Sequence, residues 1–293
     1  MVVCGRVILP PACRFRAPVT CRFCALTLLR GGQRITIAES GPQVGGRARL
    51  ESRLAGLSSW RRIVDYRLNY LNKSNAVDLY LQSKMTARDI AQIKADNVIL
   101  ATGSTWRRDG VGSMNFVPRA LAAPGLLVLT PDDILAGQKP QGRVVVYDDE
   151  HNYMASVIAE DLARAGANVT YVTPMPTLAP WTENTLEQKL IIDRLTKLGC
   201  EIWVHQALIE TASGCTRFTT TAIDCETLVF VGARTPNTAL WDALPKDRPL
   251  YRIGDGEVPG TIQAAVLSGH RIAREILAGA PSEMNLDRQL IEF

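Results

Sequence analysis

Apolar residues recur along this chain in two alternating patterns, short dense runs and longer segments with helical spacing. Dense runs that suit buried strands lie at 34–37, 77–81, 95–100, 143–147, 168–173, 201–204, 216–220, 227–231 and 250–253. Helical spacing occupies 54–71, 154–162, 182–198 and 261–278. Strands that alternate with helices predict an α/β fold, in which helices cover the faces of a parallel sheet.

The stretch from 33 to 47 joins one of these strands to a turn rich in glycine and proline. The strand ends at Glu39, and a carboxylate at the end of a second parallel strand is where a dinucleotide-binding fold holds an adenosine ribose through both hydroxyls. Gly45 and Gly46 have no Cβ, so the backbone there can approach a ligand closely. A first strand and a glycine-rich phosphate turn should come before this stretch, and we find neither pattern ahead of it.

A second strand–helix–strand unit, at 142–173, carries an unusual turn. In a nicotinamide-binding unit this turn has the pattern G-x-G-x-x-G, so that backbone amides meet the pyrophosphate at the start of a helix. Here Asp148, Glu150 and Tyr153 stand at the three glycine positions, and Asp149 adds a third carboxylate. Carboxylates repel phosphate, and these side chains fill the space that it needs. We therefore predict that this unit does not bind NAD(P)H.

Residues 1–24 differ from the rest of the chain. Residues 1–34 contain six arginines and no acidic residue, and four of the seven cysteines lie at 4, 13, 21 and 24. Three hypotheses fit: a metal or iron–sulfur site on these cysteines, a transit peptide, or an atypical leader, translated out of frame, that replaces the first strand and phosphate loop. The cysteines lack the second close pair of a zinc ribbon and the prolines suit a transit helix badly, so we favour the third.

Composition argues against several classes of function. The net charge of +4 divides into +6 for residues 1–34 and −2 for the remainder, with 27 basic and 29 acidic residues, so we expect no nucleic-acid partner. No uninterrupted apolar run reaches the ~18 residues of a membrane span. An odd number of cysteines without regular spacing predicts reduced thiols and a cytoplasmic protein. The three histidines show no metal-ligand spacing, and no Ser/His/Asp pattern indicates a hydrolase.

Five motifs occur in the order found in flavoproteins with two dinucleotide-binding domains. They are E-x5-GG at 39–46, ATG at 101–103, the strand–helix–strand unit from 142, VGAR at 231–234 and IGD at 253–255. From about 25 to 278 the chain resembles the C-terminal half of the trimethylamine dehydrogenase, histamine dehydrogenase and 2,4-dienoyl-CoA reductase family. The most specific segments are VVVYDDEHNYMASVIAEDLARAGANVTYVT and YRIGDGEVPGTIQAAVLSGHRIAREI, and they resemble the amine dehydrogenase branch.

This resemblance implies a fold, cofactors and partners. It implies a Rossmann-like, glutathione-reductase-type domain that binds FAD or ADP at 25–140 and 225–293, interrupted at 141–224 by an NAD(P)-binding-like domain with a degenerate phosphate loop. In the family, the N-terminal half is a barrel with FMN and a 4Fe–4S cluster, where the substrate is oxidised. The C-terminal half binds FAD and NADPH in the reductases and only ADP in the amine dehydrogenases, whose electrons leave to an electron-transfer flavoprotein.

Carried over to this sequence, the resemblance implies an adenine-nucleotide site. Its cofactor-binding residues are Glu39, Gly45, Gly46, Met85, Thr102, Gly103, Gly254 and Asp255. Glu39 would bind the ribose, the glycine pair would lie along the pyrophosphate, and the backbone of Met85 would face adenine. Asp255 would face the far end of the nucleotide. The resemblance implies no catalytic residue and no metal ligand in this chain.

Three functions remain open on these grounds. The first is the nucleotide-binding portion of an FMN/iron–sulfur amine dehydrogenase-like oxidoreductase, a fragment that binds ADP or FAD and is not catalytic alone. The second is a small FAD-dependent oxidoreductase of the 2,4-dienoyl-CoA reductase type. The third is a non-enzymatic subunit that docks on a separately encoded FMN/iron–sulfur barrel polypeptide. The degenerate second turn favours the first, because a reductase needs hydride from NADPH.

Overall fold

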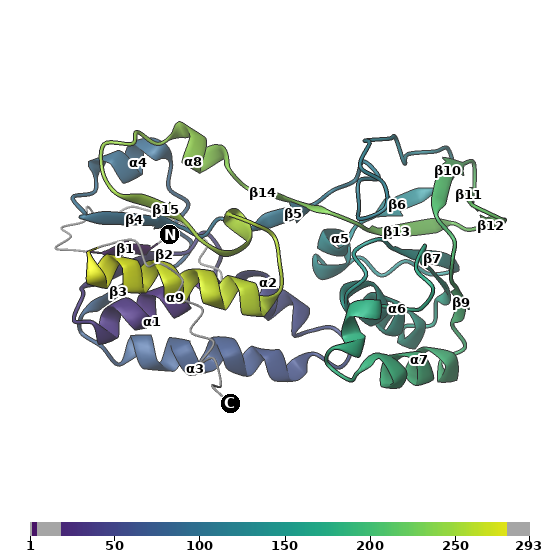
Figure 1. The fold of residues 1–293 in the computed structure, drawn as a ribbon, viewed down its shortest axis with the longest axis horizontal. Helices are drawn as coiled ribbons and strands as arrows, with labels where there is room; N and C mark the ends of the chain where they lie inside the picture. Colours follow the sequence, from purple (N-terminus) through teal and green to yellow (C-terminus); the bar gives the residue numbers. More distant parts are fainter. Residues whose placement is uncertain (1, 5–18, 280–293) are drawn as a thin grey trace, which may run out of the picture. The chain divides into compact units, whose positions relative to one another are not determined.

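The computed structural model describes residues 2–4 and 19–279, with side chains from residue 23 onward. These residues form two compact units, each assembled from separate stretches of the chain (Figure 1). Unit 1 takes the described residues up to 49 together with 60–104 and 236–279, and unit 2 takes 50–59 and 105–235. The predicted α/β class is confirmed, since each unit contains helices and a sheet with parallel strand pairs.

Unit 1 contains a five-stranded sheet in the order β15–β4–β1–β2–β3. Its strands are β1 (Val2–Cys4), β2 (Ile35–Ala38), β3 (Val77–Tyr80), β4 (Asn97–Leu100) and β15 (Leu250–Arg252). Its helices are α1 (Val19–Arg30), α3 (Arg61–Asn72), α4 (Ala87–Gln92), α8 (Ala239–Ala243), α9 (Ile262–Ala278) and the 3-10 turn η3 (Gly254–Gly256). Helices α1 and α9 pack side by side over the sheet (Figure 1).

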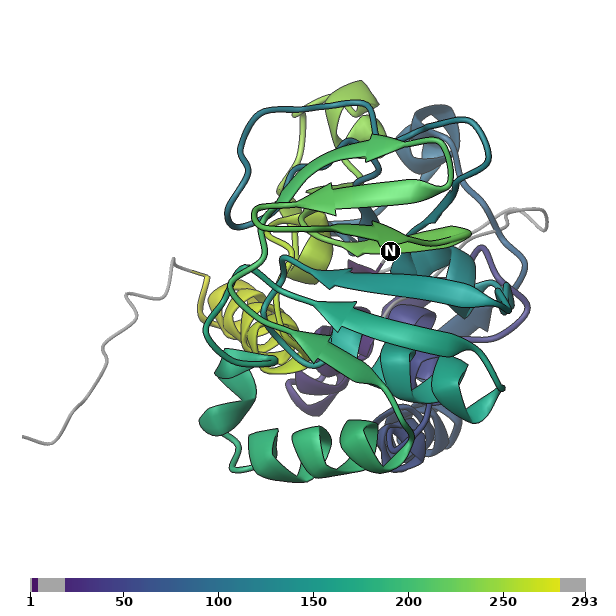
Figure 2. The ribbon, with the colours of Figure 1, turned by 90° about the vertical axis from the view of Figure 1, so that its right-hand side faces the viewer.

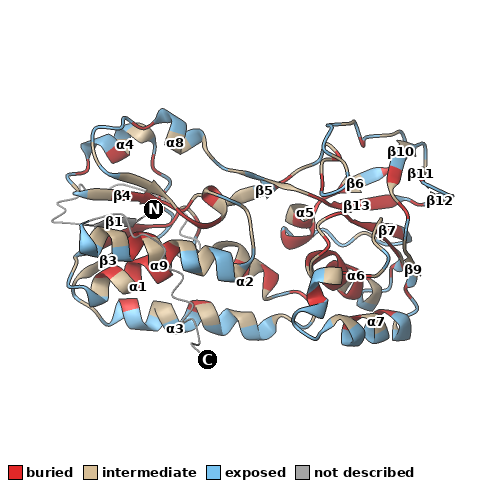
Figure 3. Cartoon of the chain, viewed as in Figure 1, coloured by how far each residue is buried: buried red, intermediate tan, exposed pale blue. Residues whose placement is uncertain are grey.

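Unit 2 contains a five-stranded parallel sheet in the order β6–β13–β7–β8–β9 (Figure 2). Its strands are β6 (Leu127–Leu129), β7 (Arg143–Asp148), β8 (Asn168–Val172), β9 (Glu201–Trp203) and β13 (Thr227–Val231), with an antiparallel sheet of β10 (Leu208–Ala212), β11 (Cys215–Phe218) and β12 (Ala222–Asp224). Its helices are α5 (Pro131–Leu135), α6 (Met154–Arg164), α7 (Gln188–Lys197) and the 3-10 turn η2 (Pro180–Glu183). Figure 3 shows α6 mostly buried, whereas much of α7 is exposed.

Four short elements lie where the chain passes from one unit to the other. They are α2 (Gly46–Glu51), the 3-10 turn η1 (Ser58–Trp60), β5 (Ser104–Trp106) and β14 (Arg234–Pro236). These crossings differ from the expected boundaries at 140/141 and 224/225. Strands β6 and β13 both pair within the sheet of unit 2, because the fully buried β13 takes β6 on one side and β7 on the other. The inserted unit thus runs from about 105 to 235.

The central strand position of unit 1 is filled in a way that the sequence did not predict. Strand β1 lies between β2 and β4 and runs antiparallel to both, with Val2 opposite Ile37 and Ile99. We found no pattern of a first strand ahead of Glu39, and residues 2–4 supply a strand at this position in the reversed direction. A parallel strand there would end at the edge where Glu39 lies and lead into a phosphate loop, whereas β1 ends at the opposite edge.

The last residues of the predicted leader belong to the fold of unit 1. Helix α1 begins at Val19, and Phe23 and Cys24 are buried, while the hypothesis of an out-of-frame leader stays a prediction. Cys13 and the side chains of Cys4 and Cys21 lie outside the described part of the chain, and the hypothesis of a metal site on them stays a prediction.

Two predicted helices are shorter than their apolar spacing indicated. The segment at 54–71 is interrupted at Gly56, which adopts a φ of 76°, and α3 begins only at Arg61. The segment at 182–198 contains Leu186 at a φ of 60°, and α7 begins at Gln188. A left-handed residue cannot continue a right-handed helix, so apolar periodicity alone overestimates both lengths.

A capping box begins helix α4. Thr86 Oγ1 accepts a hydrogen bond from the Asp89 amide at 3.3 Å, and Asp89 Oδ2 accepts one from the Thr86 amide at 2.7 Å. Thr86→Ala removes the first bond and is expected to lower the free energy of unfolding by about 1 kcal/mol in urea titrations. Thr86→Ser keeps the hydroxyl and should unfold as the wild type does. An equal loss in both variants would show that the methyl group, not the cap, stabilises α4.

Candidate functional site

Glu39 follows β2 at the carboxyl-terminal edge of the sheet of unit 1. Its side chain is only 1% exposed, which is rare for a carboxylate. Its Oε1 accepts a hydrogen bond from the Gly41 amide at 2.9 Å. Its backbone amide donates to Tyr80 at 2.8 Å, and its carbonyl accepts from the Ser83 amide at 2.7 Å. The structure thus fixes a buried carboxylate at the position that the sequence predicted for ribose binding.

The glycine pair after Glu39 is needed by the turn itself. Gly45 and Gly46 have φ values of 123° and 50°, a region that side chains disfavour. A Cβ on Gly45 would lie 2.9 Å from Arg49 Cβ and 3.1 Å from Val64 Cγ1. Backbone conformation and packing therefore account for Gly45 without a ligand, and its contact with pyrophosphate stays a prediction.

Met85 has its side chain in the core of unit 1. It is 6% exposed and belongs to an apolar cluster with Ala38, Ile90 and Val98. The prediction assigned only the backbone of Met85 to adenine, and the burial of the side chain leaves that prediction as it stands.

The ATG turn and the IGD turn lie together, although they are far apart in the sequence. Thr102 Oγ1 donates to the carbonyl of Asn237 at 2.7 Å, and the Asn237 amide donates to the carbonyl of Gly103 at 2.9 Å. Gly256 packs so closely that a Cβ there would lie 2.8 Å from Thr102 Oγ1 and 3.1 Å from its amide nitrogen. The neighbouring Gly254 has a φ of 60°. Packing of the two turns therefore accounts for Gly256 without a ligand, and contact of Thr102, Gly103 and Gly254 with a nucleotide stays a prediction.

Asp255 is the centre of a polar network in unit 1. Its Oδ2 accepts from Ser104 Oγ at 3.1 Å, and its Oδ1 accepts from the Gly260 amide at 3.1 Å. Arg47 Nη2 lies 3.3 Å from Oδ2, and the two side chains are 22% and 17% exposed. The sequence prediction included Asp255 but missed Arg47. The signal that could have found it is its place directly after the glycine pair, at the same strand edge as Glu39.

Close packing of Gly256 leads to a testable prediction. Gly256→Ala places a Cβ within 3.1 Å of the Thr102 backbone, so we expect unit 1 to lose about 1–3 kcal/mol in urea unfolding. Gly260→Ala is the matched control, because its Cβ would meet only the Cβ of Ala264 at 3.3 Å and a backbone oxygen at 3.9 Å. Equal losses in the two variants would contradict the close contact of the two turns.

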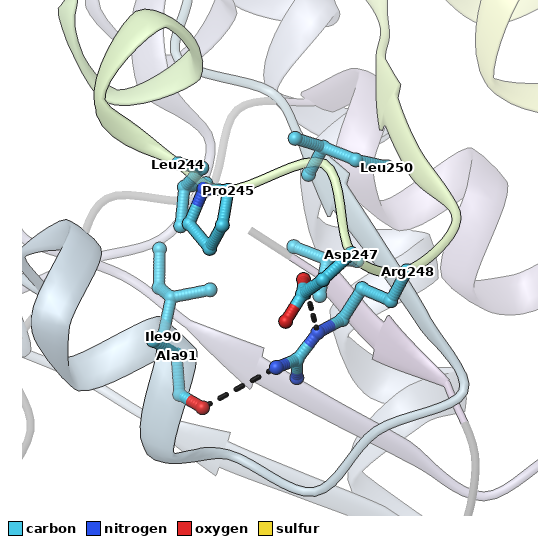
Figure 4. Close-up of a pocket in the computed structure, with 8 residues that line it drawn as sticks. Ile90, Ala91, Leu244, Pro245, Asp247, Arg248 and Leu250 are labelled. Atoms are coloured by element: carbon cyan, nitrogen blue, oxygen red, sulfur yellow. Dashed lines mark hydrogen bonds and ion pairs between the residues drawn. The ribbon is translucent and has the colours of Figure 1, made fainter.

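A second place in unit 1 is a pocket whose lining includes none of the residues predicted to bind the nucleotide (Figure 4). Its lining consists of Ile90, Ala91, Val98, Leu244, Pro245, Asp247, Arg248 and Leu250. Arg248 already donates to the carbonyls of Ile93 and Ala91, at 2.6 and 3.3 Å, and lies 3.3 Å from Asp247. Its polar groups bind one another, so we do not assign a ligand to it.

In unit 2, the degenerate turn satisfies its own backbone amides. Asp148 ends β7 and is fully buried. Its Oδ1 accepts from the amides of Glu150 and His151, at 3.2 and 2.8 Å, and its Oδ2 accepts from the hydroxyl of Tyr171. Such amides would meet a pyrophosphate in a working dinucleotide unit, and a carboxylate of the chain itself takes that place here. Burial raises the pKa of Asp148 to about 7, although these hydrogen bonds act to lower it.

The other charged side chains of this turn also contact groups of the chain itself. Asp149 is 1% exposed, its Oδ1 accepts from the Met114 amide at 3.0 Å, and His151 Nε2 lies 3.5 Å from the same oxygen. Burial raises the pKa of Asp149 to about 6 and lowers that of His151. Arg234 of the VGAR motif lies 3.4 Å from Glu150. These contacts support the prediction that phosphate has no room here.

Two kinds of site are not found in the described part of the chain. Its helices include none that is long and apolar enough to cross a membrane. Among residues 2–4 and 19–279, no group of three or more His, Cys, Asp or Glu side chains could hold a metal ion.

Comparison with known proteins finds relatives that are named as amine dehydrogenases. The OYE-like second alpha/beta domain family matches residues 129–220. Dimethylamine dehydrogenase of Hyphomicrobium sp. (strain x) is 31% identical in an alignment that covers 86% of this chain and 40% of that protein. Histamine dehydrogenase from Rhizobium sp. 4-9 superposes with a TM-score of 0.85 and 34% identity, over 93% of this chain and 43% of that one. The chain belongs to the amine dehydrogenase family.

Two other solved structures are similar to this chain to different degrees. The 6-hydroxypseudooxynicotine amine oxidase from Pseudomonas geniculata N1 has a TM-score of 0.83 and 35% identity, over 91% of this chain and 43% of that one. A flavoprotein disulfide reductase from Escherichia coli, at 14% identity and a TM-score of 0.54, shares the fold alone. The chain spans about two-fifths of the length of its amine dehydrogenase relatives.

Proposed function

We propose that this chain is the nucleotide-binding portion of an amine dehydrogenase-like oxidoreductase, that unit 1 binds ADP or FAD, and that the chain does not oxidise an amine alone. Glu39 carries the proposal. It is a buried carboxylate, fixed by backbone hydrogen bonds, at the end of a parallel strand. In a glutathione-reductase-type Rossmann domain, both hydroxyls of the adenosine ribose donate to such a group.

Two further observations support an adenine nucleotide in unit 1 and none in unit 2. The packing of Gly256 on the turn at Thr102 brings the predicted nucleotide residues of the two turns to one place in unit 1. In unit 2, the carboxylate of Asp148 occupies the amides that would bind a pyrophosphate. FAD, when bound, would supply redox chemistry, and ADP would supply none. Glu39 has the same role toward either, since both contain the adenosine ribose.

Purification and ligand analysis test this proposal. We expect denaturation to release an adenine nucleotide, or the apoprotein to bind added ADP, and we expect no oxidation of methylated amines with an artificial electron acceptor. A flavin band at about 450 nm that survives gel filtration would select FAD over ADP. Failure to bind either nucleotide would refute the proposal. Amine oxidation by the purified chain would refute its non-catalytic part.

The proposal implies a redox partner. Amine oxidation needs a redox cofactor, and we propose that a polypeptide or chain segment with an FMN/iron–sulfur barrel provides it. Copurification of a flavin- and iron-containing polypeptide from the native host would support this part. A host extract in which amine oxidation and this chain separate completely on gel filtration would contradict it.

A further inference from the structure

We propose that a second copy of this chain docks on helix α7 of unit 2, with the two helices antiparallel around a two-fold axis at Leu190. This interaction goes beyond the proposed function and does not depend on it. None of the residues predicted to bind a nucleotide belongs to this surface, since all of them lie in unit 1.

Large apolar side chains are exposed around the start of α7. Trp181 lies on η2, Leu186 in the turn that follows and Leu190 in the first turn of the helix, and they are 63%, 87% and 58% exposed. Figure 3 shows that much of α7 itself is exposed. Apolar residues scattered singly over a surface need no explanation, whereas three within ten residues, one of them Trp, are typical of an interaction surface.

Polar side chains of the same segment bond the chain itself. Thr182 Oγ1 donates to the carbonyl of Ala179 at 2.7 Å, and Gln188 Nε2 donates to the carbonyl of Leu178 at 2.8 Å. A surface turn more commonly directs such polar groups to water and its apolar groups to the core. The turn before α7 has the opposite arrangement, which suits contact with another protein surface.

Leu186 has a backbone conformation that a leucine disfavours. Its φ is 60°, and its amide donates to the carbonyl of Glu183 at 2.9 Å, so the turn holds it in the left-handed region. Glycine or asparagine adopts this region more readily. A side chain that is 87% exposed gains little packing within one copy to offset the strain. A second copy that covers Leu186 would supply that packing.

The charges of this segment are self-complementary. All six charged side chains from 183 to 197 are exposed, and they form three pairs of opposite sign: Glu183 with Lys197, Glu187 with Arg194, and Lys189 with Asp193. The midpoint of every pair lies between positions 190 and 191. In a two-fold interface of antiparallel helices, a residue before the axis faces the residue equally far after it in the other copy. Two α7 helices centred on Leu190 therefore bring each charge to an opposite one.

Contacts within the chain leave these charges available. Arg194 lies 3.3 Å from Glu160, yet its side chain is 45% exposed. Lys189 and Asp193 are exposed and have no ion pair with the described part of the chain. Both lie on α7, three positions or fewer from Leu190, so they are the charges nearest to the proposed axis.

Sedimentation equilibrium of the full chain tests the proposal. We expect a monomer–dimer equilibrium whose dissociation constant rises at least about 10-fold in Leu190→Asp, because the axis would place two new charges together in place of an apolar contact. Leu267→Asp is the matched control, since Leu267 is also 58% exposed and lies on helix α9 of unit 1. A wild type that is monomeric at every concentration, or equal losses in the two variants, would overturn the proposal.

Exchange of charges tests the antiparallel arrangement. Lys189→Glu and Asp193→Lys each place like charges opposite one another in a dimer of identical copies, and each alone should dimerise about 10-fold more weakly at low salt. An equal mixture of the two variants restores opposite charges at both positions and should dimerise as the wild type does. A mixture that associates no more tightly than either variant alone would refute a two-fold axis at Leu190.

Leu186→Asn separates docking from folding. Asparagine tolerates the left-handed region, so the variant should unfold at the same urea concentration as the wild type or at a higher one. Unfolding is measured on dilute, monomeric protein. The dimer should nonetheless be weaker, because the apolar side chain is gone, and a dimer as tight as that of the wild type would contradict the contact at Leu186. Should Leu190→Asp not fold, Leu186→Asn and the mixture of charge variants decide the question.

Discussion

Replacement of Asp148 by asparagine is expected to stabilise the protein more at pH 8 than at pH 5, by about 2–3 kcal/mol. The cause is the burial of this carboxyl, which raises its pKa from 3.8 to about 7. A group whose pKa is higher in the folded state binds its proton more tightly there. Its contribution to stability is fully present below about pH 3.8 and is lost as the pH rises through about 7.

Asparagine resembles the protonated form of Asp148. Its amide oxygen can accept from the amides of Glu150 and His151, and its amide nitrogen can donate to the hydroxyl oxygen of Tyr171. The variant therefore keeps three hydrogen bonds and removes a buried charge, which is the costly form above pH 7.

Unfolding by urea at pH 5 and pH 8 measures the effect. The difference between variant and wild type isolates Asp148, because Asp149 and His151 also have shifted pKa values, upward and downward respectively, in both proteins. Exposed Asp193→Asn is the control for the change in charge. A variant that gains nothing at pH 8 relative to pH 5 would show that Asp148 is stabilised as the carboxylate.

Replacement of Glu39 by alanine is expected to weaken ADP binding by about 100-fold or more. Two hydroxyls of the ribose donate to the carboxylate in the proposed complex, and each such bond to a charged group contributes about 1.5–3 kcal/mol. Glu39→Gln retains one acceptor oxygen and should lose about 10-fold. Titration calorimetry with ADP measures both losses.

A ligand that lacks one hydroxyl provides the control for Glu39. The wild type should bind ADP more tightly than 2′-deoxy-ADP, and Glu39→Gln should discriminate less between the two. A variant that loses affinity but discriminates as well as the wild type would indicate that Glu39 supports the fold of the turn through the Gly41 amide, 2.9 Å from its Oε1. That result would remove the main support for the proposed function.

Local patterns in the sequence were sufficient for the fold class. Alternating strands and helices predicted the α/β architecture, and the end of a strand placed Glu39 at a sheet edge, whereas Asp255 entered only through the family resemblance. The contact between Arg47 and Asp255 joins residues more than 200 positions apart, and no local pattern contains it. Sequence reasoning also treated Asp148 as an obstacle to phosphate, and only its contacts show that it is an acceptor for the turn.

The sequence did not predict the direction of β1 or the sheet to which β13 belongs, and the reason is physical. A short strand such as β1 pairs through its backbone, which can bond its neighbours in either direction, so its side chains do not encode its direction. A buried run such as β13 is apolar on both faces and suits the centre of either sheet. Its assignment to unit 2 depends on β6 and β7, which pair with it there.

The reversed direction of β1 bears on how the protein is prepared for study. Val2 lies opposite Ile37 and Ile99, so the amino-terminal end of this strand is at the sheet edge that carries Glu39. An affinity tag or fusion partner placed ahead of Val2 would emerge beside the proposed nucleotide site and compete with ligand for that space. Binding measurements should use a carboxyl-terminal tag, and loss of ADP binding on moving the tag to the amino terminus would itself report the direction of β1.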